Sequence, residues 1–245
     1  MIYKPVVKFQ HPFMMTICGP SQCGKTHFIK ELIKFNDEIF EPPFTKLLYY
    51  YSSSYQEMFD EIKSIIHEQK NTTLQKYEFI KCKLHIPSVT DIKQKLGNQT
   101  LIILDDLMIN ATDNKDNTKK LDEIATRDCH HEDFSIIFTC QNSNYGNTKL
   151  RTARTNSQYI IVFNNVGDNR NLKTLLFNKG LSKNFMDCLI DDRNENDHGY
   201  IVFDNHIKSK HNVRIRKDIF PNELDRKSTR LNSSHLKLSR MPSSA

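Results

Sequence analysis

The chain has 245 residues, with 35 Lys and Arg against 29 Asp and Glu, a formal net charge of +6. It contains no run of eighteen apolar residues, which excludes a membrane-spanning helix, and its opening stretch MIYKPVVKFQHPFMM lacks the apolar block of a secretion signal. The six cysteines follow no pairing rhythm and no C-x-x-C spacing, so we expect thiols in a reducing, intracellular compartment rather than disulfides or a zinc site.

The last 21 residues, 225–245, differ from the rest of the chain in composition. They hold five Lys or Arg and one Asp, are rich in Ser, and show no apolar periodicity, as a disordered segment does. They also resemble an in-frame translation of a sequencing-library adapter, a natural basic tail being the alternative. We therefore expect one domain over 1–224 and an adapter-derived, disordered tail over 225–245. Without the tail, 30 basic side chains face 28 acidic ones, so net charge indicates little about nucleic-acid binding.

Apolar runs predict the elements of this domain in chain order. The run 13–18 (FMMTIC) reads as a buried strand, and apolar residues at helical spacing over 28–35 predict a helix after the loop that follows. Further strands are predicted at 46–54, 81–87, 100–106, 134–142, 158–165 and 199–206, and helices at 55–69 and about 117–128. Continuous apolar strands alternating with amphipathic helices are typical of the α/β class. We expect a mostly parallel central sheet with helices on both faces.

The motif GPSQCGKT, residues 19–26, lies between the first predicted strand and its helix, as a P-loop does. Gly19 and Gly24 allow the backbone to approach phosphate oxygens, and the loop N–H groups with the helix N-terminus form an anion site. Lys25 would supply positive charge to the β- and γ-phosphates of ATP, and the Thr26 hydroxyl would ligate Mg²⁺. The residues expected to bind the nucleotide are Gly19, Pro20, Ser21, Gln22, Cys23, Gly24, Lys25, Thr26 and His27.

Polar residues close two later apolar runs. Asp105 ends TLIILDD (100–106) and is expected to hold the Mg²⁺ shell with Thr26, while Asp106 would orient and deprotonate the attacking water. The other interpretation of either carboxylate is capping of a helix that follows the strand. Gln141 ends the run FSIIFTCQN and can both donate and accept hydrogen bonds, so we expect it to sense the γ-phosphate. On its own, a polar residue at a strand end usually forms a turn.

Transition-state charge on the γ-phosphoryl group requires a cation, and an arginine finger is worth about 10³–10⁵ in rate. Arg127, just before the strand that ends at Gln141, is the first candidate; Arg151 and Arg154 follow. A neighbouring subunit can supply such an arginine, which would make hydrolysis depend on ring assembly. For each arginine the alternative is a surface ion pair.

Two further clusters stand out. His130 and His131 have no additional ligand at metal spacing, which favours a turn or core role. The segment KSKHNVRIRK (208–217) holds five Lys or Arg in ten residues. It could contact phosphates in a DNA channel, or its charges could protect an edge strand from pairing with other chains. Both interpretations remain open at this stage.

The motifs GPSQCGKT, LIILDDLM, RDCHH…SIIFTCQN, RTNSQYIIVFNN and RIRKDIFP together resemble genome-packaging ATPases of the FtsK–HerA superfamily. The likeness is greatest to those of Maverick/Polinton elements and adintovirus-like double-stranded DNA viruses, relatives of the poxvirus packaging ATPase. It covers about 10–222, in the family's order and spacing.

This resemblance implies a homo-oligomeric ring, a hexamer or pentamer, that threads double-stranded DNA into a viral capsid in the host nucleus or a cytoplasmic assembly site. It gives Lys25, Thr26, Asp105, Asp106 and Gln141 the family's ATPase roles. Arg127 matches a subunit-bridging arginine. Relatives often have Arg where this chain has Glu132, so Arg127, Arg151 and Arg154 all remain candidates for the finger.

Other classes of P-loop protein fit less well. A superfamily 3 helicase, or another DNA-translocating ATPase, is the main alternative, but such helicases usually bring an origin-binding or nuclease domain and end the later strand in Asn. A small-molecule kinase would need an arginine-rich lid and a monophosphate pocket. A protein that binds nucleotide only as a structural element is disfavoured by the complete set of Lys25, Thr26 and Asp105.

Overall fold

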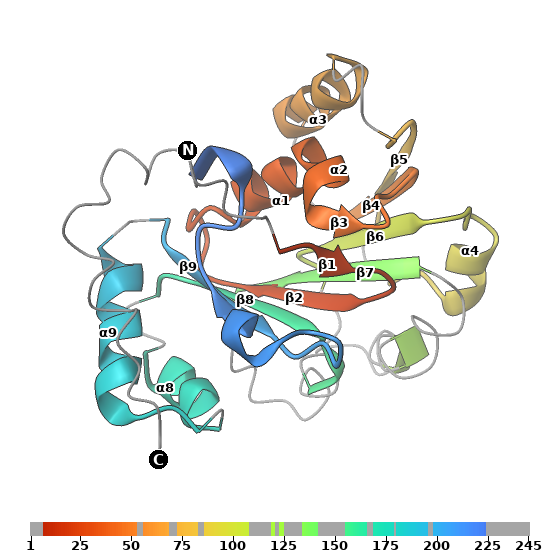
Figure 1. Ribbon diagram of the computed structural model, residues 1–245. Helices are drawn as coiled ribbons and strands as arrows, with labels where there is room; N and C mark the ends of the chain where they lie inside the picture. Colours follow the sequence, from red (N-terminus) through yellow and green to blue (C-terminus); the bar gives the residue numbers. More distant parts are fainter. Residues whose placement is uncertain are drawn as a thin grey trace.

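The computed structural model describes residues 7–52, 56–68, 73–82, 86–107, 119–120, 123–124, 134–141, 155–165, 169–178, 180–195 and 198–223. These residues fold around an eight-stranded sheet (Figure 1). In spatial order its strands are β10 (Ile215–Arg216), β9 (Tyr200–Asp204), β8 (Tyr159–Phe163), β2 (Met14–Cys18), β7 (Phe134–Cys140), β6 (Thr100–Asp105), β4 (Lys46–Tyr51) and β5 (Lys76–Lys81).

Most of the sheet is parallel. Every neighbouring pair from β5 across to β8 runs parallel, whereas β9 is antiparallel to β8, and β10 is antiparallel to β9. A separate two-stranded parallel ladder joins β1 (Phe9–Gln10) to β3 (Phe40–Glu41). β9 is buried on both faces, so its sequence is the same kind of continuous apolar run as that of a parallel strand.

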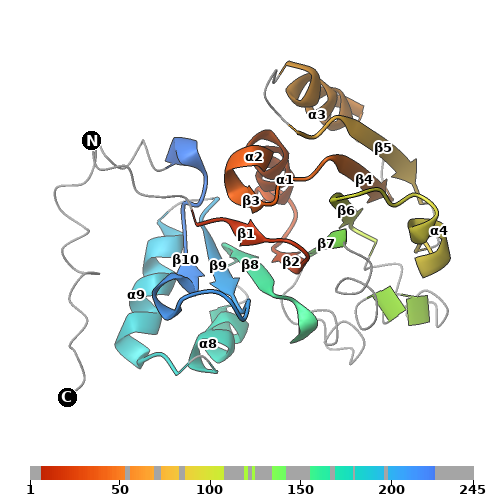
Figure 2. The same ribbon diagram turned by 45° about the vertical axis from the view of Figure 1, so that its right-hand side comes forward.

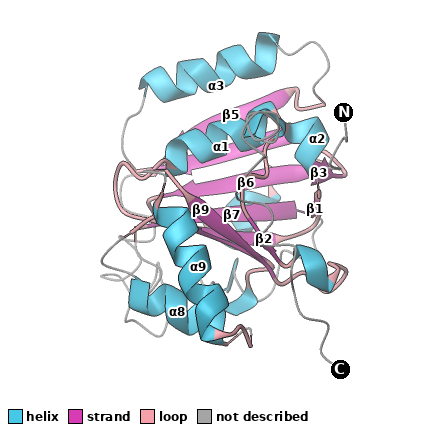
Figure 3. Ribbon diagram, turned by 60° about the vertical axis from the view of Figure 1, so that its left-hand side comes forward, coloured by secondary structure: helices cyan, strands magenta, loops and turns pink. Residues whose placement is uncertain are grey.

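Helices cover both faces of the sheet (Figure 3). One face packs against α1 (Lys25–Lys34), α2 (Asn36–Ile39) and α3 (Gln56–Glu68); the other packs against α4 (Val89–Lys93), α8 (Asn169–Phe177) and α9 (Lys183–Asn194). Successive residues alternate between these layers, because side chains alternate across a strand. Ile103 and Ile137 lie in the core under α1, and Ile102 and Ile136 lie in the opposite core with Ile92 of α4. The predicted fold class is confirmed.

The strand of this region begins earlier than the predicted run 81–87 (KCKLHIP). β5 spans Lys76–Lys81, so of the predicted run Lys81 lies in it, while residues 83–85 lie outside the described residues. β5 is the strand at one edge of the sheet, and its interior residues are only half-buried. Polar and apolar side chains therefore mix along it, and no continuous apolar run marks it. Pro87 cannot donate to a ladder, and Ser88 caps α4 by accepting from the Asp91 backbone N–H.

Three further helical regions were not predicted or cannot be compared in full with the prediction. α8 and α9 were not predicted, although Leu172 and Leu176 share a helix face and Ser182 caps α9. The helix expected at about 117–128 lies mostly outside the described residues; the described ones, 119, 120, 123 and 124, are helical. Within the described ranges, every helix is too short or too polar to span a bilayer.

The basic segment 208–217 forms a 3₁₀ helix (His211–Val213) followed by β10. The Arg216 guanidinium pairs with Asp204 at 2.8 Å and lies 5.0 Å from the centre of the Phe9 ring. Lys217 pairs with Asp192. These two charges stabilise the edge of the sheet, which favours the edge-strand interpretation for them. Lys208 and Lys210 are exposed.

Candidate functional site

The P-loop, Asp105 and Gln141 lie at the carboxyl ends of three neighbouring parallel strands, β2, β6 and β7 (Figure 2). The P-loop follows β2, Gln141 follows β7, and Asp105 is the last residue of β6. β7 lies between the other two strands and pairs with both. Because parallel strands end at the same edge of a sheet, the topology alone brings together groups that are far apart in the sequence.

The P-loop is anchored to the neighbouring strand at its first residue. The Gly19 N–H donates to the Cys140 carbonyl oxygen at 3.0 Å. Gly24 has φ +106°, a left-handed conformation that favours glycine, and α1 begins at the next residue. The Phe28 N–H donates back to the Gly24 carbonyl at 2.9 Å, closing the first helical turn. The free N–H groups of this turn and the helix dipole favour an anion at this position.

Lys25 is buried, and its ammonium is held inside the loop. Nζ donates to the Gly19 carbonyl at 2.6 Å and to the Pro20 carbonyl at 2.7 Å. Both acceptors are neutral, so these bonds fix the ammonium without cancelling its charge. The side chains of Ser21, Gln22, Thr26 and His27 are exposed along the same loop and first helical turn.

Cys23 fills the interior of the loop. Its side chain is buried in the core, and burial raises the pKa of its thiol above 9.0. The group is therefore a neutral thiol near neutral pH, which does not repel a phosphate as a thiolate would. His198, from the segment before β9, lies within hydrogen-bonding distance of this part of the loop: its Nδ1 is 3.2 Å from the Cys23 carbonyl oxygen.

Asp105 is buried, with 7% of its surface exposed, and both of its carboxylate oxygens accept hydrogen bonds. The Tyr49 hydroxyl on β4 donates to Oδ2 at 2.8 Å, and the Thr139 hydroxyl on β7 donates to Oδ1 at 2.7 Å. The Thr139 oxygen in turn accepts from the Asp106 backbone N–H at 2.8 Å. The Asp105 carboxylate and the Asp106 backbone are therefore connected through Thr139 of the neighbouring strand as well as through the chain.

Asp106 begins the turn after β6, with φ 52°. Burial raises the pKa of its carboxyl group above 3.8, and the nearby charge of Asp105 raises it further, while Lys25 opposes both effects. Its Oδ1 is buried and has no hydrogen-bond partner within the described part of the chain. An unsatisfied carboxylate oxygen beside a lysine is costly unless a further ligand or proton engages it.

Gln141 follows Cys140 at the end of β7 and is half-buried. Cys140 pairs in register with Cys18, the residue before the loop, and their sulfur atoms lie 3.1 Å apart without forming a disulfide. The arginine candidates Arg127, Arg151 and Arg154 lie outside the described residues, as do His130 and His131.

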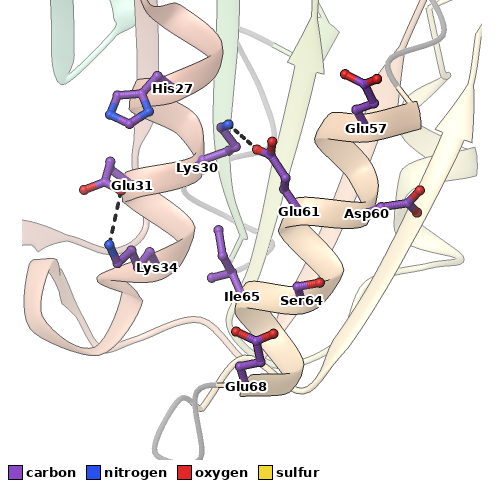
Figure 4. Close-up of a pocket in the computed structure, with 10 residues that line it drawn as sticks. All are labelled: His27, Lys30, Glu31, Lys34, Glu57, Asp60, Glu61, Ser64, Ile65 and Glu68. Atoms are coloured by element: carbon purple, nitrogen blue, oxygen red, sulfur yellow. Dashed lines mark hydrogen bonds and ion pairs between the residues drawn. The ribbon is translucent and has the colours of Figure 1, made fainter.

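An open groove of about 700 Å³ runs along the surface between α1 and α3 (Figure 4). Its lining residues are His27, Lys30, Glu31, Lys34, Glu57, Asp60, Glu61, Ser64, Ile65 and Glu68. Lys30 pairs with Glu61 across the groove, and Lys34 pairs with Glu31 along α1. Five carboxylates against two lysines make this surface unfavourable for a triphosphate. Of the expected nucleotide-binding residues, His27 is the one that borders it.

Three side chains that contact the candidate residues were not predicted from the sequence: Tyr49, Thr139 and His198. Thr139 had a signal, since it is a polar residue inside the run FSIIFTC, two positions before Gln141. Tyr49 sits within KLLYYY and is indistinguishable there from its neighbours. His198 contacts the loop from 175 residues away, and nothing in its local sequence indicates this.

Comparison with known proteins gives one family and several distant structures. The sequence model of the family described as "Poxvirus A32 protein" matches residues 6–240. The genome packaging NTPase B204 of Sulfolobus turreted icosahedral virus 2, in complex with ATP-gammaS, is 14% identical with a TM-score of 0.49, over 84% of this chain and 97% of that one. The complex of B204 with AMPPCP is 10% identical with a TM-score of 0.43, over 84% of this chain and 96% of that one. The structure of EssC (ATPases 2 and 3) from Geobacillus thermodenitrificans is 10% identical with a TM-score of 0.38, over 62% of this chain and 32% of that one. Comparison with curated proteins finds no significant match.

Proposed function

Since the chain belongs to the poxvirus A32 protein family, the viral packaging ATPases of FtsK–HerA type, we propose that it translocates double-stranded DNA into a capsid, driven by Mg²⁺-dependent ATP hydrolysis in a ring of identical subunits. It is a P-loop ATPase. The observation that carries the proposal is the convergence of Lys25, Asp105 and Asp106 at the carboxyl ends of β2 and β6, the strands on either side of β7, where the Lys25 charge acts on Asp106. This arrangement supports phosphate binding and water activation in one place.

Phosphate binding begins with an exchange of partners by Lys25. The ammonium that donates to the Gly19 and Pro20 carbonyls can turn to the β- and γ-phosphate oxygens of ATP. The phosphate oxygens carry negative charge and the two carbonyls do not, so Coulomb attraction to the ammonium favours the exchange. The N–H groups of Gly24, Lys25 and Thr26, where the loop enters α1, would donate to the same phosphates.

The residues at the site suit Mg²⁺. Within the described ranges, no cluster of three or more His, Cys, Asp or Glu residues could hold a metal by itself. Mg²⁺ instead favours one or two carboxylates, a hydroxyl, waters and substrate phosphates. The Thr26 hydroxyl and the Asp105 carboxylate would be the protein ligands of that set, and Asp106 is the next residue after Asp105. Bound there, Mg²⁺ would neutralise negative charge that develops on the phosphates.

Asp106 is the proposed general base. Its raised pKa gives the carboxylate a greater proton affinity than an ordinary aspartate, which favours proton transfer from the attacking water. Gln141, at the end of the adjacent strand, would hold the same water and contact the γ-phosphate.

Assembly would complete the site. Arg127, or alternatively Arg151 or Arg154, is proposed to reach the γ-phosphate of a neighbouring subunit in a hexamer or pentamer, so that hydrolysis requires a ring. The partners are then double-stranded DNA, other copies of the chain and viral capsid proteins. Packaging would take place inside the host cell, in the nucleus or at a cytoplasmic assembly site.

ATP hydrolysis by matched lysine variants tests this proposal. Lys25→Ala removes the ammonium at the loop and should reduce turnover by at least about 10²-fold. Lys30→Ala removes a lysine from the same helix, where it pairs with Glu61, and should leave turnover within about twofold of the wild type. Equal hydrolysis by the wild type and Lys25→Ala would show that ATP is cleaved elsewhere or by a contaminant.

A further inference from the structure

The Thr139 hydroxyl lies between Asp105, the last residue of β6, and Asp106, the residue that follows it. Thr139 is fully buried on β7. It follows Phe138, which pairs in register with Leu104 of β6. It therefore neighbours Asp105 across the ladder. Both side chains point to the face that packs against α1, as Ile103 and Ile137 do two residues earlier on each strand.

The direction of the hydrogen bonds at Thr139 is fixed. The Asp106 backbone N–H can only donate, so at 2.8 Å the Thr139 oxygen is its acceptor. The single hydroxyl proton of Thr139 is then left for Asp105 Oδ1, which lies 2.7 Å away and accepts. A continuous chain of donors runs from the Asp106 backbone through the threonine to the Asp105 carboxylate. Such chains polarise one another in a buried setting.

This chain holds a backbone conformation that needs support. Asp106 has φ 52°, in the left-handed region that non-glycine residues seldom occupy. The direction of the Asp106 side chain depends on that turn. A residue in such a conformation persists when its surroundings over-determine it, and the bond from its N–H to Thr139 is one such constraint.

We propose that Thr139 is a positioning residue of the ATPase site, which sets the orientation of Asp106 relative to Asp105. The inference rests on the proposed function, in which Asp105 holds the Mg²⁺ shell and Asp106 activates water. Thr139 itself would not touch the nucleotide. Its loss should therefore lower the rate of cleavage while leaving ATP held by the P-loop, because reacting groups misplaced by about 1 Å can lose 10²-fold in rate.

The chain offers variants that separate positioning from folding. Thr139→Val keeps the shape and removes the hydroxyl, and Thr139→Ser restores the hydroxyl. Ser135→Ala is the matched control, since Ser135 is a buried hydroxyl on the same strand that accepts from the Phe13 N–H at 2.9 Å. Ser135 lies near the amino end of β7, opposite the end that carries Thr139.

The test measures kcat, the affinity for a non-hydrolysable ATP analogue with Mg²⁺, and hydrogen exchange of the Asp106 amide in the full chain. Thr139→Val should lower kcat at least tenfold, change the analogue affinity by less than about threefold, and speed Asp106 exchange about tenfold relative to the Leu104 amide. Thr139→Ser should recover most of each loss. Ser135→Ala should keep kcat and Asp106 exchange near wild type, even if its melting temperature falls.

The outcomes distinguish the inference from the function on which it rests. A wild-type chain that does not hydrolyse ATP overturns the proposed function. Unchanged Asp106 exchange in Thr139→Val overturns the inference whatever the activity. Equal losses of kcat in Thr139→Val and Ser135→Ala, in proportion to their melting temperatures, also overturn it, because removal of any buried hydroxyl would then have the same effect.

Discussion

The Lys25 ammonium donates to the carbonyl oxygen of Gly19, six residues earlier in the same loop, at 2.6 Å. Gly19 thus accepts from the lysine and, through its own N–H, binds the Cys140 carbonyl of the neighbouring strand. The first residue of the P-loop connects the phosphate-binding lysine to β7, the strand that also carries Thr139 and leads to Gln141. A change at Gly19 should therefore affect more than the loop.

Gly19→Ala should destabilise the protein and weaken nucleotide binding. A Cβ there would lie 2.5 Å from the Cys23 sulfur and 2.7 Å from the Phe163 Cβ, both closer than real contacts. Overpacking of this kind costs about 1–3 kcal/mol. Gly97→Ala is the control, because its Cβ would have no neighbour nearer than 3.7 Å. Denaturant unfolding and ATP-analogue binding measure the effects, and equal stability of the two variants would contradict the Gly19 packing.

Asp106→Asn should bind nucleotide normally and fail to cleave it. The amide keeps the shape of the side chain but cannot accept the proton of water, and loss of a general base costs about 10²–10⁴-fold in rate. Analogue affinity and single-turnover cleavage separate the two effects. Asp60→Asn, on the exposed side of α3 beside Lys63, should change neither quantity. Normal single-turnover rates in Asp106→Asn would assign the base elsewhere.

The raised pKa of Asp106 predicts a pH dependence of both rate and stability. A base must be ionised, so the acid limb of the cleavage rate should lie above the ordinary aspartate value of 3.8. The folded protein holds the Asp106 proton more tightly than the unfolded chain does. This contribution to the free energy of unfolding is therefore full below 3.8 and is lost as pH rises through the folded pKa. Unfolding of the wild type and Asp106→Asn across this range should differ in slope; parallel curves would contradict the raised pKa.

Arg127→Ala should be inactive alone and recover activity when mixed with Lys25→Ala. The lysine variant has no working loop but still offers Arg127 to a neighbouring site, so mixed rings regain some complete sites. A mixture of Lys25→Ala with Asp106→Asn is the control, since both lesions disable the subunit that carries them. Steady-state hydrolysis across mixing ratios is the measurement. No recovery at any ratio would leave Arg151 and Arg154 as the candidates for the finger.

Fully buried strands could be predicted from the sequence because burial on both faces produces continuous apolar runs. β6 and β7 are buried along their whole lengths and were predicted to within two residues of their ends. β5 was missed because an edge strand is half-buried and gives no such run. The antiparallel direction of β9 could not be predicted either, since its sequence reads like that of a parallel strand.

The same distinction applies to the candidate site: residues in local motifs could be predicted, and contacts between distant segments could not. Lys25, Asp105 and Asp106 could be predicted as site residues because each lies at or after the end of a strand within a short local motif, and their roles also remain predictions. The contacts of Tyr49 and Thr139 with Asp105 depend on strand order and register, which are relations between distant segments. The sequence around a hydroxyl in an apolar run does not indicate which distant residue it will hydrogen-bond. The roles given to Gln141 and Arg127 remain predictions.

If this site drives movement of DNA by an assembled ring, hydrolysis must depend both on contact between subunits and on DNA. ATP hydrolysis per subunit should be followed with and without duplex DNA over a wide range of protein concentration. A ring motor whose site is completed by its neighbour predicts a rate per subunit that rises with protein concentration and rises again with DNA. A rate per subunit that is constant across concentration and indifferent to DNA would contradict the account.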